Sequence, residues 1–171
     1  MANTFELIAS STVGILGVSS IDFTSIPSTY TDLCVVASIR TNYAAVSDDM
    51  CMRFNSSSSS YANRQVFGTG SAVGAGAPFT DRLYIGAGDG ALATTSTFSS
   101  NRIYISNYAG SNNKSSMTEG LMENNATEAY ANLVSGLWSN SSAVTSISIF
   151  SNYSSTISQY STAYLYGVKN A

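Results

Sequence analysis

The sequence predicts an all-β fold, an antiparallel two-sheet β-sandwich of jelly-roll type. First, most periodic stretches repeat with a period of two, which places successive side chains on opposite faces of an extended strand. Second, short segments rich in Gly, Ser and Asn separate these stretches, and such residues favour turns. Third, no long stretch repeats with a helical period. Many short strands joined by turns are typical of a sandwich or jelly roll.

Ten short strands are expected. Alternation of apolar with polar or small residues is clearest at 33–40, 50–54, 83–85, 103–105, 144–149 and 164–166. In chain order, the expected strands cover residues 4–9, 31–40, 49–55, 61–67, 82–87, 101–108, 115–123, 126–134, 143–150 and 160–168. The faces expected to be exposed are mostly Ser, Thr, Tyr and Asn, and because Thr and Tyr are good strand formers, propensity agrees with pattern. The stretch 115–134 fits neither period cleanly, so a short helix over Ala126–Leu133 is the alternative there.

The chain is predicted to form one domain over residues 1–171. A domain of this size buries roughly 70% of the surface that its unfolded chain exposes, which is enough for a core of its own. No change in composition divides the chain, and no internal repeat occurs. The serine run at 56–60 is expected to be a loop tip rather than a linker.

Composition argues against an enzyme. Charged residues make up only 10% of the chain, and its net charge is -3. The chain is instead rich in hydroxyl residues, with 32 Ser and 16 Thr. The chain has no histidine, which excludes Ser-His-Asp and Cys-His catalysis, His-based zinc sites and an imidazole pH switch. A nucleic-acid partner would need clustered Lys and Arg. We expect no enzymatic activity, no cofactor and no nucleic-acid partner.

Neither membrane insertion nor secretion is indicated. Residues 1–10 carry no basic residue and no long apolar core, so they do not resemble a signal peptide. The most apolar run, at 33–37, is far shorter than the ~20 residues of a membrane helix. Cys34 and Cys51 are expected to be two buried free thiols, and a disulfide between neighbouring strands is the alternative.

The catalytic and metal-binding motifs are weak. Ser111–Lys114 has the Ser-x-x-Lys spacing of penicillin-binding enzymes, but it lies in an expected turn and lacks the partner elements. Glu119 and Glu123 fall in one segment, which sets no pair of carboxylates across a cleft for glycoside hydrolysis. Asp48-Asp49 and Gly88–Gly90 offer oxygen ligands without matching a calcium-loop pattern. We expect ordinary turns and no metal, with glycan cleavage as a minor alternative.

The 11 tyrosines are the most function-like feature. Four of them lie in or beside expected loops: Tyr43, Tyr61, Tyr108 and Tyr153. Exposed aromatic rings beside amides and hydroxyls stack on sugars or hold partner surfaces, so Tyr108 and Tyr153 are the candidate glycan-binding residues. Two other interpretations stay open: tyrosines that only cover strand faces, and a subunit interface, which a neutral aromatic surface suits.

Segments at both ends resemble a known β-sandwich module. Near the start, residues 20–33 read SIDFTSIPSTYTDL and are followed by a strand to Arg40 and by MRFN at 52–55. Near the end come GLWS at 136–139, AVTSI at 143–147 and LYGV at 165–168. This order resembles a jelly-roll-like module of structural proteins of tailed phages, especially those of marine and cyanobacterial hosts. The motifs are clear at the two ends, and the resemblance spans nearly the whole chain.

The resemblance implies a fold and a virion context rather than a reaction. Members occur in long tail fibres and as small stand-alone virion proteins. Without a coiled-coil stalk or collagen-like repeat, this chain is more similar to a capsid decoration (cement) protein, which usually acts as a homotrimer or in symmetric clusters.

The expected function is therefore a non-enzymatic virion structural protein that stabilises the head. Its partners would be copies of itself and other virion proteins, either the major capsid protein or tail components. It would be made in the host cytoplasm and reside in the virion. The alternative is a tail or tail-fibre module that binds carbohydrate or a receptor, with host glycan as its ligand.

Overall fold

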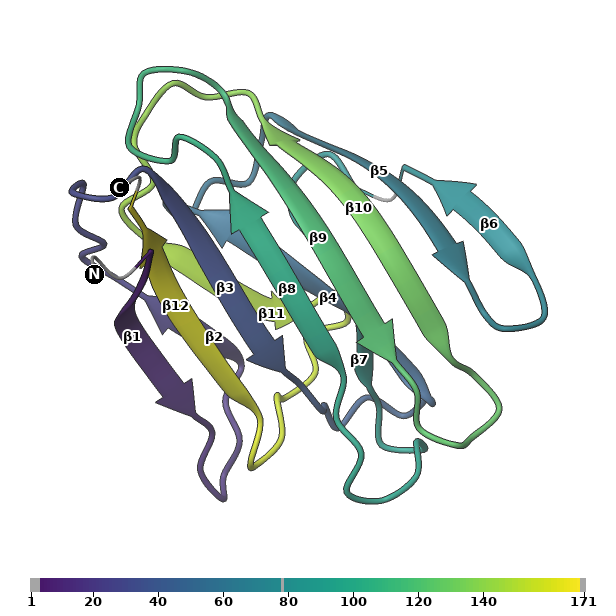
Figure 1. Cartoon of the computed structure of the whole chain (residues 1–171). Helices are drawn as coiled ribbons and strands as arrows, with labels where there is room; N and C mark the ends of the chain where they lie inside the picture. The colour runs from purple at the N-terminus through teal and green to yellow at the C-terminus, as the bar shows by residue number, and fades with distance from the viewer. Residues whose placement is uncertain (1–3, 78, 170–171) are drawn as a thin grey trace.

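A computed structural model of the chain describes residues 4–77 and 79–169, and within them every regular element is a β-strand. The strands form two antiparallel sheets, and Figure 1 shows the larger one in front of the smaller one. In spatial order, the eight-stranded sheet contains β1 (Phe5–Thr12), β12 (Thr162–Val168), β3 (Asp32–Ser38), β8 (Ser100–Ile105), β9 (Lys114–Met122), β10 (Tyr130–Trp138), β5 (Tyr61–Gly68) and β6 (Val73–Gly76). The four-stranded sheet contains β2 (Ser20–Phe23), β11 (Ile147–Ser151), β4 (Ser47–Phe54) and β7 (Leu83–Asp89).

The strand order confirms the predicted sandwich and its jelly-roll character. Strands β1, β12, β3 and β8 stand side by side in the larger sheet, and β2, β11, β4 and β7 do so in the smaller one. The chain crosses between sheets at each step from β1 to β4, which is the double-sheet winding of a jelly roll. Two insertions, β5–β6 after β4 and β9–β10 after β8, extend the larger sheet beyond this eight-strand frame.

The ten expected strands all have counterparts, but two further strands were not expected. These are β2 and β6, of four residues each, which are too short to display a period. The helical alternative for Ala126–Leu133 is wrong, because β10 begins at Tyr130 after a bend. The Asn124 side chain accepts the Ala126 N–H at 3.0 Å, which makes the local turn that the short polar side chain of asparagine favours.

The core lies between the sheets and is continuous along them. Its large aromatic members include Trp138 from β10, Phe54 from β4 and Tyr61 from β5, all almost fully buried. The rings of Phe54 and Trp138 meet edge to face with centroids 5.7 Å apart, and those of Tyr61 and Trp138 are stacked at 6.1 Å. This aromatic cluster (Phe54, Tyr61 and Trp138) joins the two sheets beneath β10.

The sheets approach each other closely where two glycines, Gly86 and Gly120, face one another. A Cβ on Gly120 would lie 3.3 Å from the Cα of Gly86 and 2.6 Å from Oδ1 of Asn101. Gly86 also has a φ of 96°, which only glycine adopts readily. The contact brings β7, the edge strand of the smaller sheet, against β9 and β10.

Cys34 and Cys51 are free and buried, as expected. Cys34 lies on β3 in the larger sheet and Cys51 on β4 in the smaller sheet, and burial raises the pKa of both thiols. Because the thiolate is the reactive form, we expect both thiols to react slowly in the folded chain. We expect Ellman's reagent to find almost no reactive thiol in the native protein and both thiols after denaturation. Rapid reaction of either cysteine in the native protein would contradict this placement.

Candidate functional site

The outer face of the larger sheet is the candidate interaction surface. Cross-strand register places one row of outward residues in the order Leu7, Tyr166, Cys34, Tyr104, Met117, Ser135 and Arg64. The next row reads Ser10, Tyr164, Val36, Arg102, Glu119, Leu133, Val66 and Ala75. We call this surface the large-sheet face. Aliphatic and aromatic residues occupy most of its positions.

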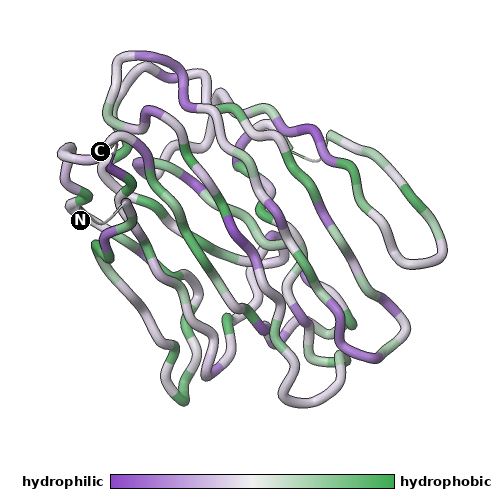
Figure 2. The backbone as a smooth tube through the Cα atoms, in the orientation of Figure 1, coloured by the Kyte–Doolittle hydropathy of each residue, from purple (hydrophilic) through white to green (hydrophobic). Residues whose placement is uncertain are grey.

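Several apolar side chains on the large-sheet face are well exposed to solvent. Leu133 is 49% exposed, and Val66, Met117 and Leu121 are similarly open. On the opposite surface of the sandwich, one row of the smaller sheet is polar and reads Asp22, Ser148 and Arg53. The next row reads Ser20, Phe150, Cys51 and Tyr84, and its Cys51 and Tyr84 are buried. In Figure 2, green and white segments dominate the larger sheet, with hydrophilic colour confined to short stretches. A broad exposed apolar surface on one side of a protein marks an interaction site.

An ion pair lies near the middle of the large-sheet face. Arg102 on β8 and Glu119 on β9 are direct cross-strand partners, and Arg102 Nε donates to Glu119 Oε2 at 2.9 Å. Both side chains are about half exposed, so within one chain the pair contributes little to stability. The pair is electrically neutral as a unit and carries one charge of each sign in adjacent positions.

Two shallow apolar hollows flank this ion pair. One, of about 470 Å³, is lined by residues that include Val36, Tyr104, Met117 and Tyr166. The other, of about 700 Å³, lies over β10, β5 and β6 and is lined in part by Val66, Val73 and Leu133. Arg102 lines the first and Glu119 the second. Hollows of this kind accept projecting side chains from a partner.

The structure corrects the assignment of Tyr108 as a glycan-binding residue. Tyr108 is 1% exposed and belongs to the core. Its hydroxyl donates to the carbonyl of Pro27 and accepts the N–H of Tyr30 at 3.4 Å. The ring therefore fastens the segment before β3 to the core and presents no face to a sugar. Tyr61 is buried as well, where it binds the backbone of Phe54.

Tyr153, by contrast, lies at the surface in the loop after β11 and is 49% exposed. Its ring stacks on that of Tyr43, with centroids 4.4 Å apart and planes 5° from parallel. The Tyr153 hydroxyl donates to Asp49 Oδ2 at 3.3 Å, and the neighbouring Asp49 charge raises the pKa of that hydroxyl. The structure thus brings together two of the four tyrosines singled out from the sequence, from loops far apart in the chain.

The remaining motifs have structural roles. Lys114 is fully buried at the start of β9, where its ammonium group donates to the carbonyls of Gly110 and Asn112, while Ser111 is exposed in the turn. Burial lowers the pKa of Lys114. Its contacts hold the turn closed, as expected for a structural Ser-x-x-Lys match.

The acidic residues are likewise engaged locally. Asp48 accepts the hydroxyls of Thr41 and Ser151 at 2.7 and 3.0 Å, and Asp89 accepts the amide of Asn124 at 2.8 Å. Both aspartates lie in strands, β4 and β7, rather than in the expected turns. Over residues 4–77 and 79–169, no group of three or more His, Cys, Asp or Glu side chains is placed to hold a metal ion.

The large-sheet face is the feature that sequence reasoning missed. Exposed strand faces were expected to be mostly Ser, Thr, Tyr and Asn, but β9, β10 and β5 present Met117, Leu121, Leu133 and Val66 outward. The sequence does contain a sign of this surface, because apolar residues occupy both odd and even positions within a strand, as at Leu133 and Val134. That pattern indicates a strand covered on both faces.

No helix in the described part of the chain is long and apolar enough to span a membrane. No protein-family model, curated protein or solved structure matches this chain.

Proposed function

We propose that this protein is a non-enzymatic structural subunit of a tailed-phage virion, a capsid decoration protein that works as a symmetric homo-oligomer. The observation that carries the assembly role is the large-sheet face. The virion context rests on the sequence resemblance at the two ends of the chain. Its partners would be copies of itself and the major capsid protein.

The dimensions of the large-sheet face suit a stable interface. Eight strands about 4.8 Å apart, with roughly five or six residues each in the plane, span about 700 Å². A standard interface covers about 800 Å² on each partner. Most of this surface is apolar, and its central ion pair is neutral as a unit, so covering it costs little desolvation of net charge.

A second copy of the chain is the partner that best complements this face. A two-fold axis between the Arg102 and Glu119 positions sets Arg102 of each copy opposite Glu119 of the other, so that one surface pairs with itself. Packing of this kind leaves the smaller sheet of each copy free to contact the shell. A subunit that binds only assembled capsomers stabilises them by mass action.

The test is a cryo-electron microscopy map of the intact particle. We expect density for the sandwich at symmetry axes of the shell, with the large-sheet face covered by another copy or by the capsid protein. Copies confined to the tail, or copies with this face open to solvent throughout, would overturn the proposal.

A further inference from the structure

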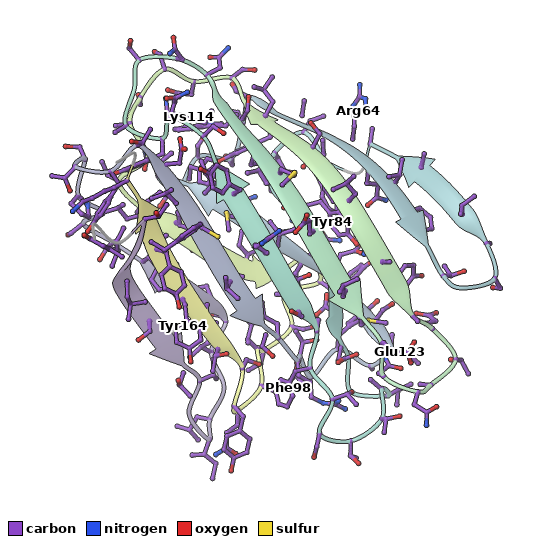
Figure 3. All side chains as sticks on the ribbon, viewed as in Figure 1. Arg64, Tyr84, Phe98, Lys114, Glu123 and Tyr164 are labelled. Atoms are coloured by element: carbon purple, nitrogen blue, oxygen red, sulfur yellow. The ribbon has the colours of Figure 1, made fainter. Side chains whose placement is uncertain are left out.

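An inter-sheet cavity lies where the smaller sheet stops covering the larger one. The smaller sheet ends at β7, whereas the larger one continues through β10, β5 and β6. At this edge is a cavity of about 180 Å³. Its walls include Ser47, Asp49, Gln65, Tyr84, Tyr130 and Asn132. Tyr84, labelled in Figure 3, lies on β7 of the smaller sheet, and β9 and β10 pass in front of that region in the picture.

Two amide side chains in the cavity wall have buried polar atoms without a partner. Asn132 on β10 is only 7% exposed, yet its Nδ2 makes no hydrogen bond in the described structure. Gln65, on the neighbouring strand β5, leaves Oε1 buried and unpaired. Unpaired buried amides are rare in folded proteins and destabilise them. One atom requires an acceptor and the other requires a donor.

A third buried amide on the same inner face, that of Asn63, is fully hydrogen-bonded, unlike those of Asn132 and Gln65. Asn63 lies two residues before Gln65 on β5, and its Nδ2 donates to the carbonyls of Phe79 and Arg82, each at 2.8 Å. Its Oδ1 accepts the N–H of Tyr84 at 2.9 Å. The fold therefore satisfies the buried amide that it uses for support and leaves the two in the cavity open.

The chemistry of the wall selects the class of ligand. A hydroxyl group both donates and accepts, so adjacent hydroxyls satisfy Gln65 Oε1 and Asn132 Nδ2 together. No Lys or Arg is among the described residues that line the cavity, whereas Asp49 is, and this disfavours an anion. Burial raises the pKa of Asp49 and of Tyr84, so the site favours neutral groups. An apolar ligand would leave both amides unpaired.

Aromatic rings complete the site. Tyr130 packs edge to face on Phe67 at 6.0 Å, and both line the cavity. Asp49, which lines the cavity, also accepts a hydrogen bond from the Tyr153 hydroxyl, and the ring of Tyr153 is stacked on Tyr43. Aromatic rings beside amides and a carboxyl group provide the stacking and hydrogen bonds that a sugar ring uses. The volume lies below the ~300 Å³ at which drug-sized pockets begin, which suits one small unit.

We propose that this cavity binds a neutral polyhydroxylated ligand, one sugar unit that is either free or at the end of a glycan. Asn132 and Gln65 bind its hydroxyls, and Asp49 connects the cavity wall to the stacked pair of Tyr43 and Tyr153. The site is separate from the large-sheet face, because Asn132 and Gln65 point inward while Leu133 and Val66 point outward. A copy assembled through the large-sheet face therefore keeps this cavity.

The test is a titration of the full chain with glucose, galactose, mannose and N-acetylglucosamine at millimolar concentration. In a proton–nitrogen correlation spectrum, we expect at least one sugar to shift the side-chain amide signals of Asn132 and Gln65 in a saturable manner. Repeating the titration with methyl glycosides distinguishes a free sugar from the end of a glycan. If the natural ligand is the end of a glycan, we expect both the free sugar and its methyl glycoside to bind. If the natural ligand is a free sugar, we expect only the free sugar to bind. Absence of saturation with all of these sugars would overturn the proposal.

A pair of matched variants separates binding from support. Asn132→Leu removes an unpaired amide, so we expect it to weaken sugar binding about tenfold or more while the thermal midpoint stays the same or rises. Asn63→Leu removes a fully bonded amide and is expected to lower the midpoint clearly. Sugar binding that survives Asn132→Leu, or a fall in midpoint equal to that of Asn63→Leu, would show that Asn132 serves only the fold.

Discussion

Leu133→Arg is expected to convert the assembled protein into monomers. Leu133 is half exposed in the middle of the large-sheet face, on the same cross-strand row as Arg102 and Glu119. Because Glu119, the cross-strand neighbour of this position, already pairs with Arg102, an arginine there adds an uncompensated positive charge to a desolvated interface. Substitutions of this kind within an interface raise the dissociation constant about 30-fold or more. Sedimentation velocity over a range of protein concentrations measures the change directly.

The matched control is Leu92→Arg. Leu92 is 66% exposed in the turn after β7, outside the large-sheet face, so an arginine there adds the same charge without touching the proposed interface. We expect the Leu92→Arg protein to assemble like the parent. If both variants assemble, or if the parent is a monomer at every concentration, the large-sheet face is not a self-association surface.

Charge reversal tests the two-fold arrangement itself. In the R102E chain both central positions are acidic, and in the E119R chain both are basic, so each single variant is expected to repel its own copies. Mixing the two chains should restore assembly, because each acidic face then meets a basic one. The double variant R102E/E119R should assemble alone. Failure of the mixture to assemble would exclude the proposed opposition of Arg102 and Glu119.

The sequence predicts the layers of this fold well, because a period of two is a local property. Strands such as β3 and β12 bury one parity of residues against the core, and the pattern is visible within seven residues. What a local pattern cannot contain is the pairing of distant segments. The extension of the larger sheet depends on β10 meeting both β9 and β5, and the cavity exists because β7 ends the smaller sheet there.

The candidate site was harder to predict for the same reason. Tyr108 and Tyr153 both follow strands and have polar neighbours, and the sequence does not distinguish them. The structure does, because the Tyr108 hydroxyl bonds to the backbone of Pro27 and Tyr30 within the core. Tyr153 instead stacks on Tyr43 and donates to Asp49 at the surface. The burial of Tyr108 depends on contacts with residues at least 78 positions away in the sequence. A local periodicity contains no information about such contacts.

Trp138→Ala is expected to lower the free energy of unfolding by about 3–5 kcal/mol, the usual cost of removing a large buried aromatic side chain. Trp138 is the largest member of the aromatic cluster and contacts Phe54 of the smaller sheet and Tyr61 of the larger one. The cavity left behind would remove the aromatic contact between the two sheets at this point. Since domains of this kind are stable by only about 5–15 kcal/mol, the loss is a large share of the total.

Because assembly would add to apparent stability, the effect of Trp138→Ala is best measured by urea unfolding in the Leu133→Arg background. Trp138→Phe is the informative comparison. The indole Nε1 of Trp138 is buried without a hydrogen-bond partner in the described structure, so phenylalanine keeps a packed ring and removes an unsatisfied donor. We expect it to cost about 1 kcal/mol. Equal losses for the two variants would contradict this account, in which the packing of an aromatic ring joins the sheets.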